Sequence, residues 1–317
     1  MSYKRLAVVL FLAAILAVVI RMFFFETIRV TTPAMSESQS VGNRLFVEKF
    51  TLGARFPLSI GIPYAPDLFM GKKTFFGLFK TAHRIPGAGK IKRNDLIAFN
   101  YPVVDDIPMD RHPILLSRCV GLPGEYIRLH GARFYINDEE IKRPVDVSIC
   151  YRYPVDQQES IDHLLKEGKI NQKTYEKKDS GYIYLTRYEY NYLSKKEENL
   201  DAIELNACSS SFDEKTEVIP YKDFRIELNT RSFRIWGELI NKYEGVKLIR
   251  TESGKFRKNG KEADYYIFKQ NYYWVLNDHQ GYLNDSRSLG PIPENYVIGK
   301  AYMVLFSPKT KRFLQKI

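Results

Sequence analysis

The chain has 317 residues, of which 44% are hydrophobic and 14% aromatic, and its formal net charge is +11. This hydrophobic content excludes a globally disordered protein, and the many Tyr and Phe residues favour strands over helices. The positive charge suits an anionic lipid surface, but the basic residues are scattered rather than gathered in one run, so we do not expect nucleic-acid binding.

An apolar segment at the N-terminus is expected to anchor the chain in a membrane. Lys4 and Arg5 precede it, and a helix over residues 6–25 would be about 30 Å long, close to the thickness of a bilayer core. Arg21 interrupts the segment, but its long side chain can reach the interface. A cleaved signal peptide is the alternative, and it is disfavoured because bulky MFFF stands where a cleavage region needs small residues. The flanking charges do not fix the orientation.

Runs rich in Tyr, Phe, Val and Ile dominate the rest of the chain and predict a mainly β fold. Gly- and Pro-containing sequences separate several of them. The predicted strand runs are RLFVEKF (44–50), DLIAFNY (95–101), YIRLHGARFYIND (126–138), YYIFKQNYYWVLND (265–278) and VIGKAYMVLFS (297–307). Helices are predicted from about Gln157 to Lys178 and from about Ser232 to Tyr243. Both lie in the charged, irregular region 140–262, which is predicted to be an insertion or cap.

Cysteine and histidine usage gives no sign of a metal site. The five His residues are far apart, and the three Cys residues form neither a CxxC motif nor a Cys/His cluster. We therefore expect no metal and no cofactor. Cys119 lies in an apolar run and is expected in the core. Cys150 and Cys208 can pair outside the cytoplasm, but the sequence alone does not establish that pairing.

Four stretches, taken together and in order behind the anchor, resemble the bacterial type I signal peptidases, in particular their long-insert form. They are TTPAMSESQSVGNRLFVEK (31–49), KIKRNDLIAFNYP (90–102), LLSRCVGLPGEYIRLHGARFYIND (115–138) and YYWVLNDHQGYLNDSRSLGPIPENYVIGKA (272–301). The resemblance covers nearly the whole chain. It implies a single-pass protein of the bacterial plasma (inner) membrane whose C-terminal domain is extracytoplasmic and lies against membrane lipids.

The resemblance also implies how the chain is divided. An antiparallel β domain of signal-peptidase type would follow one transmembrane helix and carry an inserted cap. The expected parts are a cytoplasmic N-terminus (1–5), the anchor (6–25), the core (26–139 and 263–310), the cap (140–262) and a basic C-terminal tail (311–317).

In the family that this chain resembles, a Ser directly before Met in the first stretch is the nucleophile, and a Lys directly before Arg in the third is the general base. A hydroxyl needs a neighbour to take its proton, and a Lys can do this at neutral pH only when burial lowers its pKa. Here Ala34 precedes Met35, and Ser117 precedes Arg118. A methyl group has no lone pair, and a serine hydroxyl is no amine base. The resemblance therefore predicts that the Ser-Lys dyad is lost.

Other positions keep the family pattern. Thr32 matches the side-chain donor of the oxyanion hole. Asp285, Ser286 and Arg287 match a segment in which the Ser supports the Lys, and the Asp and Arg are expected to pair. Departures occur at Gln39, Ser40, Asn43, Gln280, Tyr282 and Leu283. One laboratory substitution would account for Ala34 alone, so the set of departures favours natural loss.

Two other catalytic arrangements are disfavoured by the sequence. A displaced nucleophile at Ser36, Ser38 or Ser40 would miss a geometry that tolerates errors below about 1 Å, and it would still lack a base. A triad built on Asp278 and His279 is poorly placed because adjacent strand residues point to opposite faces.

The sequence thus predicts a signal peptidase I homologue without peptidase activity, which binds the signal peptides of exported precursors or modulates an active paralogue or the export machinery. An active peptidase that uses displaced residues, and a membrane-anchored structural partner without a peptide groove, are the alternatives. The apolar strand at Leu45 and Val47 is a candidate for a groove that binds signal-peptide residues by strand addition, with plain core packing as the alternative.

Overall fold

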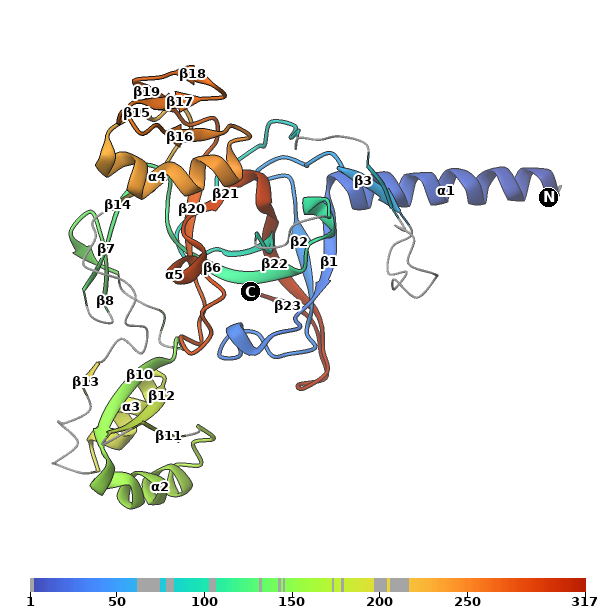
Figure 1. Ribbon diagram of the computed structural model, residues 1–317. Coiled ribbons are helices and arrows are strands. Elements are labelled where there is room, and N and C mark those ends of the chain that lie inside the picture. Colours follow the sequence, from blue (N-terminus) through green and yellow to red (C-terminus); the bar gives the residue numbers. More distant parts are fainter. Residues whose placement is uncertain are drawn as a thin grey trace, which may run out of the picture.

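A computed structural model describes residues 3–61, 75–77, 83–102, 107–130, 133–141, 144, 146–172, 174–177, 180–196, 204–205 and 217–317. It consists of an N-terminal helix followed by antiparallel β-sheets, with helices mainly in the region of the predicted insertion (Figure 1). The predicted mainly β fold is confirmed.

Helix α1 (Tyr3–Phe23) projects away from the sheets, and none of its residues is buried (Figure 1). By length and composition, it is the one helix in the described part of the chain that could cross a membrane. The helix ends at Phe23, before the predicted end of the anchor. Phe25 already belongs to strand β1 (Phe25–Arg29), where it pairs with Glu48 of the next strand.

The main sheet has eight strands. Its order is β1, β2 (Arg44–Glu48), β22 (Val297–Ser307), β5 (Leu96–Asn100), β6 (Ile114–Gly121), β20 (Tyr272–Leu276) and β21 (Ile292–Pro293), and β23 (Arg312–Lys316) also pairs with β22. All pairings are antiparallel. The predicted C-terminal tail thus contains a strand, although the side chains of β23 are exposed.

Successive residues of β5 show how the sheet separates two cores. Leu96 and Ala98 join a cluster that includes Ile28, Met35 and Leu116, which we call the inner cluster. Ile97 and Phe99 join the opposite cluster with Cys119 and Val275. This two-residue alternation is what a pleated strand buried on both faces produces. Cys119 is fully buried, as expected, and burial raises the pKa of its thiol.

One part of the predicted insertion forms a separate small sheet, seen at the lower left of Figure 1. Its strands are β11 (Thr174–Lys177), β12 (Ser180–Leu185), β10 (Ile149–Pro154) and β13 (Glu204–Leu205), and 3-10 turn η3 (Val155–Gln157), α2 (Gln158–Glu167) and α3 (Arg187–Ser194) accompany them. Cys150 in β10 is disulfide-bonded, whereas Cys208 lies outside the described residues.

A second part of the predicted insertion, which contains helix α4, packs on the main sheet. Helix α4 (Thr230–Tyr243) contributes Trp236 and Ile240 to a core that also contains Val120 of β6 and Trp274 of β20. Three smaller sheets complete this region: β14 (Glu217–Val218) with β7 (Tyr126–His130), β8 (Arg133–Ile136) and β9 (Glu139–Glu140); β15 (Arg225–Glu227) with β19 (Tyr265–Ile267); and β16 (Leu248–Arg250) with β17 (Phe256–Lys258) and β18 (Lys261–Glu262). Each of the three contributes residues to the same core. The proposed limits of the insertion stay a prediction.

The remaining elements are short: η1 (Pro33–Met35), β3 (Ser59–Gly61), β4 (Phe75–Gly77), η2 (Met109–Arg111), α5 (Ser286–Leu289) and η5 (Glu294–Tyr296). All five predicted strand runs contain strands, but 126–138 and 265–278 each contain two. The predicted helix 157–178 is wrong in its second half, because α2 ends before Gly168 and the β-favouring Thr174 and Tyr175 begin a strand.

Candidate functional site

Three distant parts of the sequence meet at the candidate site. Turn η1 lies against β6, and the segment that follows β20 joins the two. The backbone N–H of His279 donates to the carbonyl oxygen of Ala34 at 3.0 Å. From the same segment, Asn277 accepts a hydrogen bond from Ser117 through its Oδ1 atom at 2.7 Å. Positions 34 and 117, singled out from the sequence, are therefore brought together through residues 277–279.

Ser117 is fully buried, and its side chain is a structural donor. Its acceptor, Asn277, is itself held firmly: Asn277 Nδ2 donates to the carbonyl oxygen of Tyr282 at 3.0 Å and to Asn284 Oδ1 at 2.9 Å. Ala34 and Met35 are buried as well, each about 1% exposed. Met35 Sδ lies 3.4 Å from the backbone nitrogen of Asp278. Thr32 precedes η1 in an extended conformation, and its side chain does not cap the turn.

The segment 285–287 forms the buried ion pair that the sequence predicts. Arg287 Nη2 lies 2.8 Å from Asp285 Oδ2, and the same carboxylate accepts from the backbone N–H of Asn277 at 2.9 Å. The other donors of Arg287 reach the carbonyl oxygens of Gln280 and Tyr282. Ser286 Oγ accepts from the backbone N–H of Val275 at 2.8 Å. These contacts tie the loop after β20 to the strand itself.

A second ion pair, not foreseen from the sequence, joins Arg118 and Asp278. Arg118 donates through Nε to Oδ1 at 2.7 Å and through Nη2 to Oδ2 at 2.6 Å. Burial is the largest single influence and lowers the pKa of Arg118, but the hydrogen bonds with Asp278 and the negative charges of Asp278 and Asp146 together outweigh it, so the pKa is raised. Ser38 Oγ donates to Asp278 Oδ2 at 2.5 Å. The sequence shows only that an Asp follows a buried strand. This position does not indicate which basic residue pairs with it.

His279 points away from this ion pair. Its ring contacts those of Tyr184 and Tyr282, with centroid distances of 4.9 and 5.1 Å. Burial lowers its pKa. Asp278 and His279 therefore face different neighbours, as expected for adjacent residues of an extended segment, and they do not form a triad.

The insertion reaches the site through Ser148. Its backbone N–H donates to the carbonyl oxygen of Asp278 at 2.9 Å, and its carbonyl oxygen accepts from Gln280 at 3.3 Å. Glu37 lies nearby, and burial, as the largest cause, raises the pKa of its carboxyl group. Neither Glu37 nor Ser148 was identified from the sequence, because their proximity depends on where the inserted sheet joins the main one.

Two departures from the family pattern compensate each other. Gln39 and Asn43 are both buried, and Asn43 Nδ2 donates to Gln39 Oε1 at 3.3 Å. A buried polar side chain is tolerated when it finds a hydrogen-bond partner. The pair satisfies the amide nitrogen of Asn43, whereas Asn43 Oδ1 is buried without a hydrogen-bond partner in the described structure.

The prediction that the strand at Leu45 and Val47 lines a groove is corrected by the structure. Both side chains are fully buried in the inner cluster, and β2 has a partner strand on each side. The unpaired edges lie elsewhere. Strand β1 is at the end of the sheet, and β20 pairs with β6 only from Arg118 onward. In the described structure, residues 114–117 therefore have a partner strand, β5, on one side only.

The chemistry of the site follows from its donors and acceptors. The hydrogen bonds described above around positions 34 and 117 involve hydroxyl, amide, carboxylate and guanidinium groups. None of these, in the described residues, is an amine that could act as a base. Likewise, the described chain holds no group of three or more His, Cys, Asp or Glu side chains arranged for a metal ion.

A family model described as signal peptidase, peptidase S26, matches residues 3–206 and 215–306. The chain belongs to this family. It is also similar to Signal peptidase I of Buchnera aphidicola subsp. Acyrthosiphon pisum (strain APS), with 23% identity over 289 residues, which cover 91% of this chain and 70% of the relative. Family membership agrees with the antiparallel sheets and the apolar N-terminal helix. Cleavage of signal peptides is the activity of the signal peptidase I family.

Proposed function

We propose that this member of the signal peptidase family does not cleave signal peptides and instead binds exported precursors, with an active paralogue or the export machinery as its partner. One observation carries the proposal: Ala34 and Ser117 occupy the positions that the family resemblance gives to nucleophile and base, and both are hydrogen-bonded to the segment 277–279. Loss of a nucleophile or base in a serine protease costs on the order of 10⁶ in kcat.

The contacts around the site support a protein that keeps the structure of the site but lacks the catalytic groups. Asp285 and Arg287 still form a buried ion pair, and Ser286 still accepts from β20. These contacts hold the loop that would support a catalytic lysine. A scaffold of this kind is consistent with selection for binding.

The two unpaired strand edges support binding of an extended peptide. Ile28 from β1, Val30 just after that strand and Leu116 from β6 belong to the same inner cluster, so the two edges lie over one core. Strand addition uses backbone hydrogen bonds and shallow apolar contacts, and it needs no nucleophile. We therefore place the precursor between β1 and residues 114–117 of β6.

The proposed location is the extracytoplasmic side of a bacterial plasma membrane, with α1 as a single-pass anchor. The disulfide at Cys150 supports this side, since disulfides persist in oxidising compartments. The apolar length of α1 supports the anchor.

Photo-crosslinking tests precursor binding. The full chain, reconstituted in a membrane, would be mixed with a preprotein that carries a photoreactive residue near the end of its signal peptide. We expect crosslinks to β1 and to residues 114–117, and none from a matched preprotein labelled deep in its mature part. Equal labelling by both preproteins, or none, would contradict precursor binding and favour a purely structural partner.

One contact favours a second candidate, an active peptidase with Ser38 as its nucleophile. Ser38 does donate to a carboxylate, Asp278. However, Arg118 already occupies both oxygens of that carboxylate. The carboxylate is thus committed to an ion pair, and the variant Ser38→Ala separates the two candidates.

A further inference from the structure

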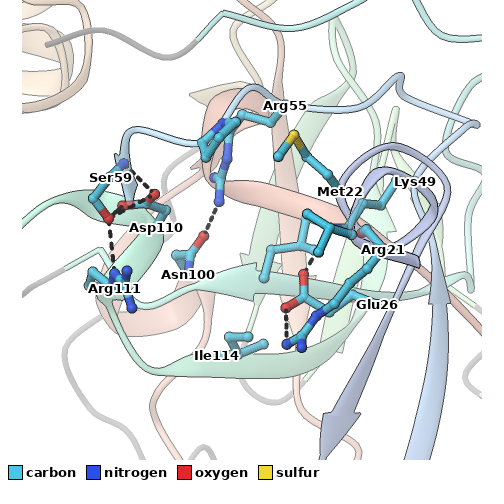
Figure 2. A pocket seen from close by; sticks show the side chains of 13 residues that line it. Arg21, Met22, Glu26, Lys49, Arg55, Ser59, Asn100, Asp110, Arg111 and Ile114 are labelled. Carbon is cyan, nitrogen blue, oxygen red and sulfur yellow. Dashed lines mark hydrogen bonds and ion pairs between the residues drawn. The ribbon is translucent and has the colours of Figure 1, made fainter. Parts of the chain in front are cut away.

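A cavity of about 340 Å³ lies where α1 meets the main sheet (Figure 2). The C-terminal end of α1 contributes Arg21 and Met22 to its wall, and strands and loops of the β domain contribute Lys49, Arg55 and Arg111. The wall contains neither Ala34 nor Ser117, but it includes Glu26 of β1 and Ile114 of β6, so the cavity lies beside the same two strand edges at which we place the precursor. Its wall joins the proposed membrane anchor to the domain that the anchor carries.

The charge of the wall is positive. Four cationic side chains, Arg21, Lys49, Arg55 and Arg111, face two carboxylates, Glu26 and Asp110. Glu26 is already engaged, because its carboxylate lies 2.9 Å from Lys49 Nζ. Asp110 accepts from the backbone N–H groups of residues 58 and 59, each at 2.9 Å. The carboxylates therefore leave part of the positive charge uncompensated.

Arg55 is the residue of the wall that most strongly indicates an anion site. Figure 2 shows its side chain directed between Asp110 on one side and Met22 on the other, toward Asn100. Nη2 donates to Asn100 Oδ1 and Nη1 to the carbonyl oxygen of Asn295, both at 2.7 Å. Both acceptors are neutral, and no ion pair among the described residues includes Arg55.

The pKa of Arg55 also supports an anion site. Burial, followed by repulsion from Arg84, lowers the pKa of Arg55 to about 10. The guanidinium group nevertheless stays charged at neutral pH. Attraction to Asp110 and Glu26 offsets part of this lowering of the pKa, but neither carboxylate forms an ion pair with Arg55 in the described structure. A buried cation without a direct ion pair is costly, so an anion that enters this cavity would be stabilised.

The position of the cavity identifies the anion. Val18 and Met22 of α1 line the wall, so in a membrane-spanning α1 the cavity lies where apolar residues give way to the interface. Guanidinium groups match phosphate oxygens with two parallel hydrogen bonds. We propose that this cavity binds the phosphate of an anionic phospholipid headgroup. The proposal rests on the anchoring role of α1 and not on precursor binding.

The test measures lipid retained by the full chain. The protein would be reconstituted in nanodiscs containing equal amounts of phosphatidylglycerol and phosphatidylcholine, extracted in mild detergent and examined by native mass spectrometry. We expect preferential retention of phosphatidylglycerol. Arg55→Gln should weaken that retention roughly tenfold, which corresponds to about 1.4 kcal/mol, because it removes a charge-assisted hydrogen bond to the phosphate.

Two further variants show whether a loss of lipid retention results from misfolding. Arg111→Gln changes a second cation of the wall and should also weaken retention, whereas Arg250→Gln changes an exposed arginine of β16 and should not. Equal retention of the two lipids, or equal loss in Arg250→Gln and the wall variants, would overturn the proposal. Displacement of the lipid by inorganic phosphate alone would overturn the lipid as the ligand. Extraction of the chain from membranes at alkaline pH would refute the anchor as well.

Discussion

At the residue scale, the fully buried position of Ser117 matters most. A lysine at such a position would be desolvated, and desolvation is what lowers the pKa of an amine enough for it to act as a base. Ser117 instead donates to Asn277, which shows how the pocket is satisfied without a base. Our proposal therefore requires only local changes of hydrogen bonding at this position, without a collapse of the surrounding structure.

Restoring the dyad is therefore expected to restore some chemistry. The double variant Ala34→Ser with Ser117→Lys should cleave a preprotein reporter above the level of the unmodified chain. Neither single variant should do so, because nucleophile and base act as a unit. A single-turnover cleavage assay checks this. As much cleavage by Ala34→Ser alone would show that another group acts as the base.

The buried ion pair predicts a large stability effect. Asp285→Asn should destabilise the β domain by about 3–5 kcal/mol, because it leaves the charge of buried Arg287 without its partner. Urea denaturation measures this. As a matched control, Glu262→Gln removes one partner of the exposed Lys255–Glu262 pair and should change stability by about 1 kcal/mol or less. Similar losses for both variants would contradict the role given to the buried pair.

Glu37 predicts a pH dependence. Its pKa is raised in the folded chain, so its contribution to stability is present below the ordinary pKa of a glutamate and is lost as pH rises through the raised value. Glu37→Gln removes that loss. The variant should thus be more stable than the unmodified chain at pH 7 and similar to it at about pH 4. Denaturation curves at both pH values would show it, and a variant less stable at pH 7 would contradict the assigned cause.

At the element scale, α1 and β1 differ in whether their residues belong to the buried core. No residue of α1 is buried, whereas Ile28 of β1 lies in the inner cluster. The helix ends and the strand begins within a few residues, so the boundary between anchor and domain is sharp. The stability of the β domain should therefore depend on β1 and not on α1.

Deletion of residues 1–20 is expected to leave the unfolding midpoint of the β domain unchanged in a given detergent. By contrast, Ile28→Ala should cost about 2–5 kcal/mol, because it empties part of a buried cluster. Chemical denaturation followed by tryptophan fluorescence compares the two. A large loss in the deletion variant would mean that α1 supports the domain directly.

The strands could largely be predicted from the sequence because their apolar and aromatic residues recur with the period of a pleated strand. The second half of the helix predicted after Gln157 could not, since its strand conformation depends on the pairing of Tyr175 with Tyr182 of β12. Ala34 and Ser117 could be singled out only through the family resemblance, and the structure links both to the segment 277–279. The contact between Arg118 and Asp278 was not, because it depends on how β6 and β20 pair.

At the scale of the whole molecule, an exposed apolar helix, a cationic cavity at its end and two unpaired strand edges belong to one chain. Together they favour a membrane-attached protein that receives an extended peptide. Ser117, at the position that the family resemblance gives to the general base, lies in the segment of β6 that forms one of those edges. The central claim is thus that binding has been kept and peptide-bond cleavage has been lost.

The most direct test is the cleavage of a preprotein reporter by the purified full chain in detergent, beside an active member of the family. We predict turnover no higher than the background, and the same background with Ser38→Ala. Turnover comparable to that of the active member, abolished by Ser38→Ala, would contradict the account and show that the chain is a working peptidase with a displaced nucleophile.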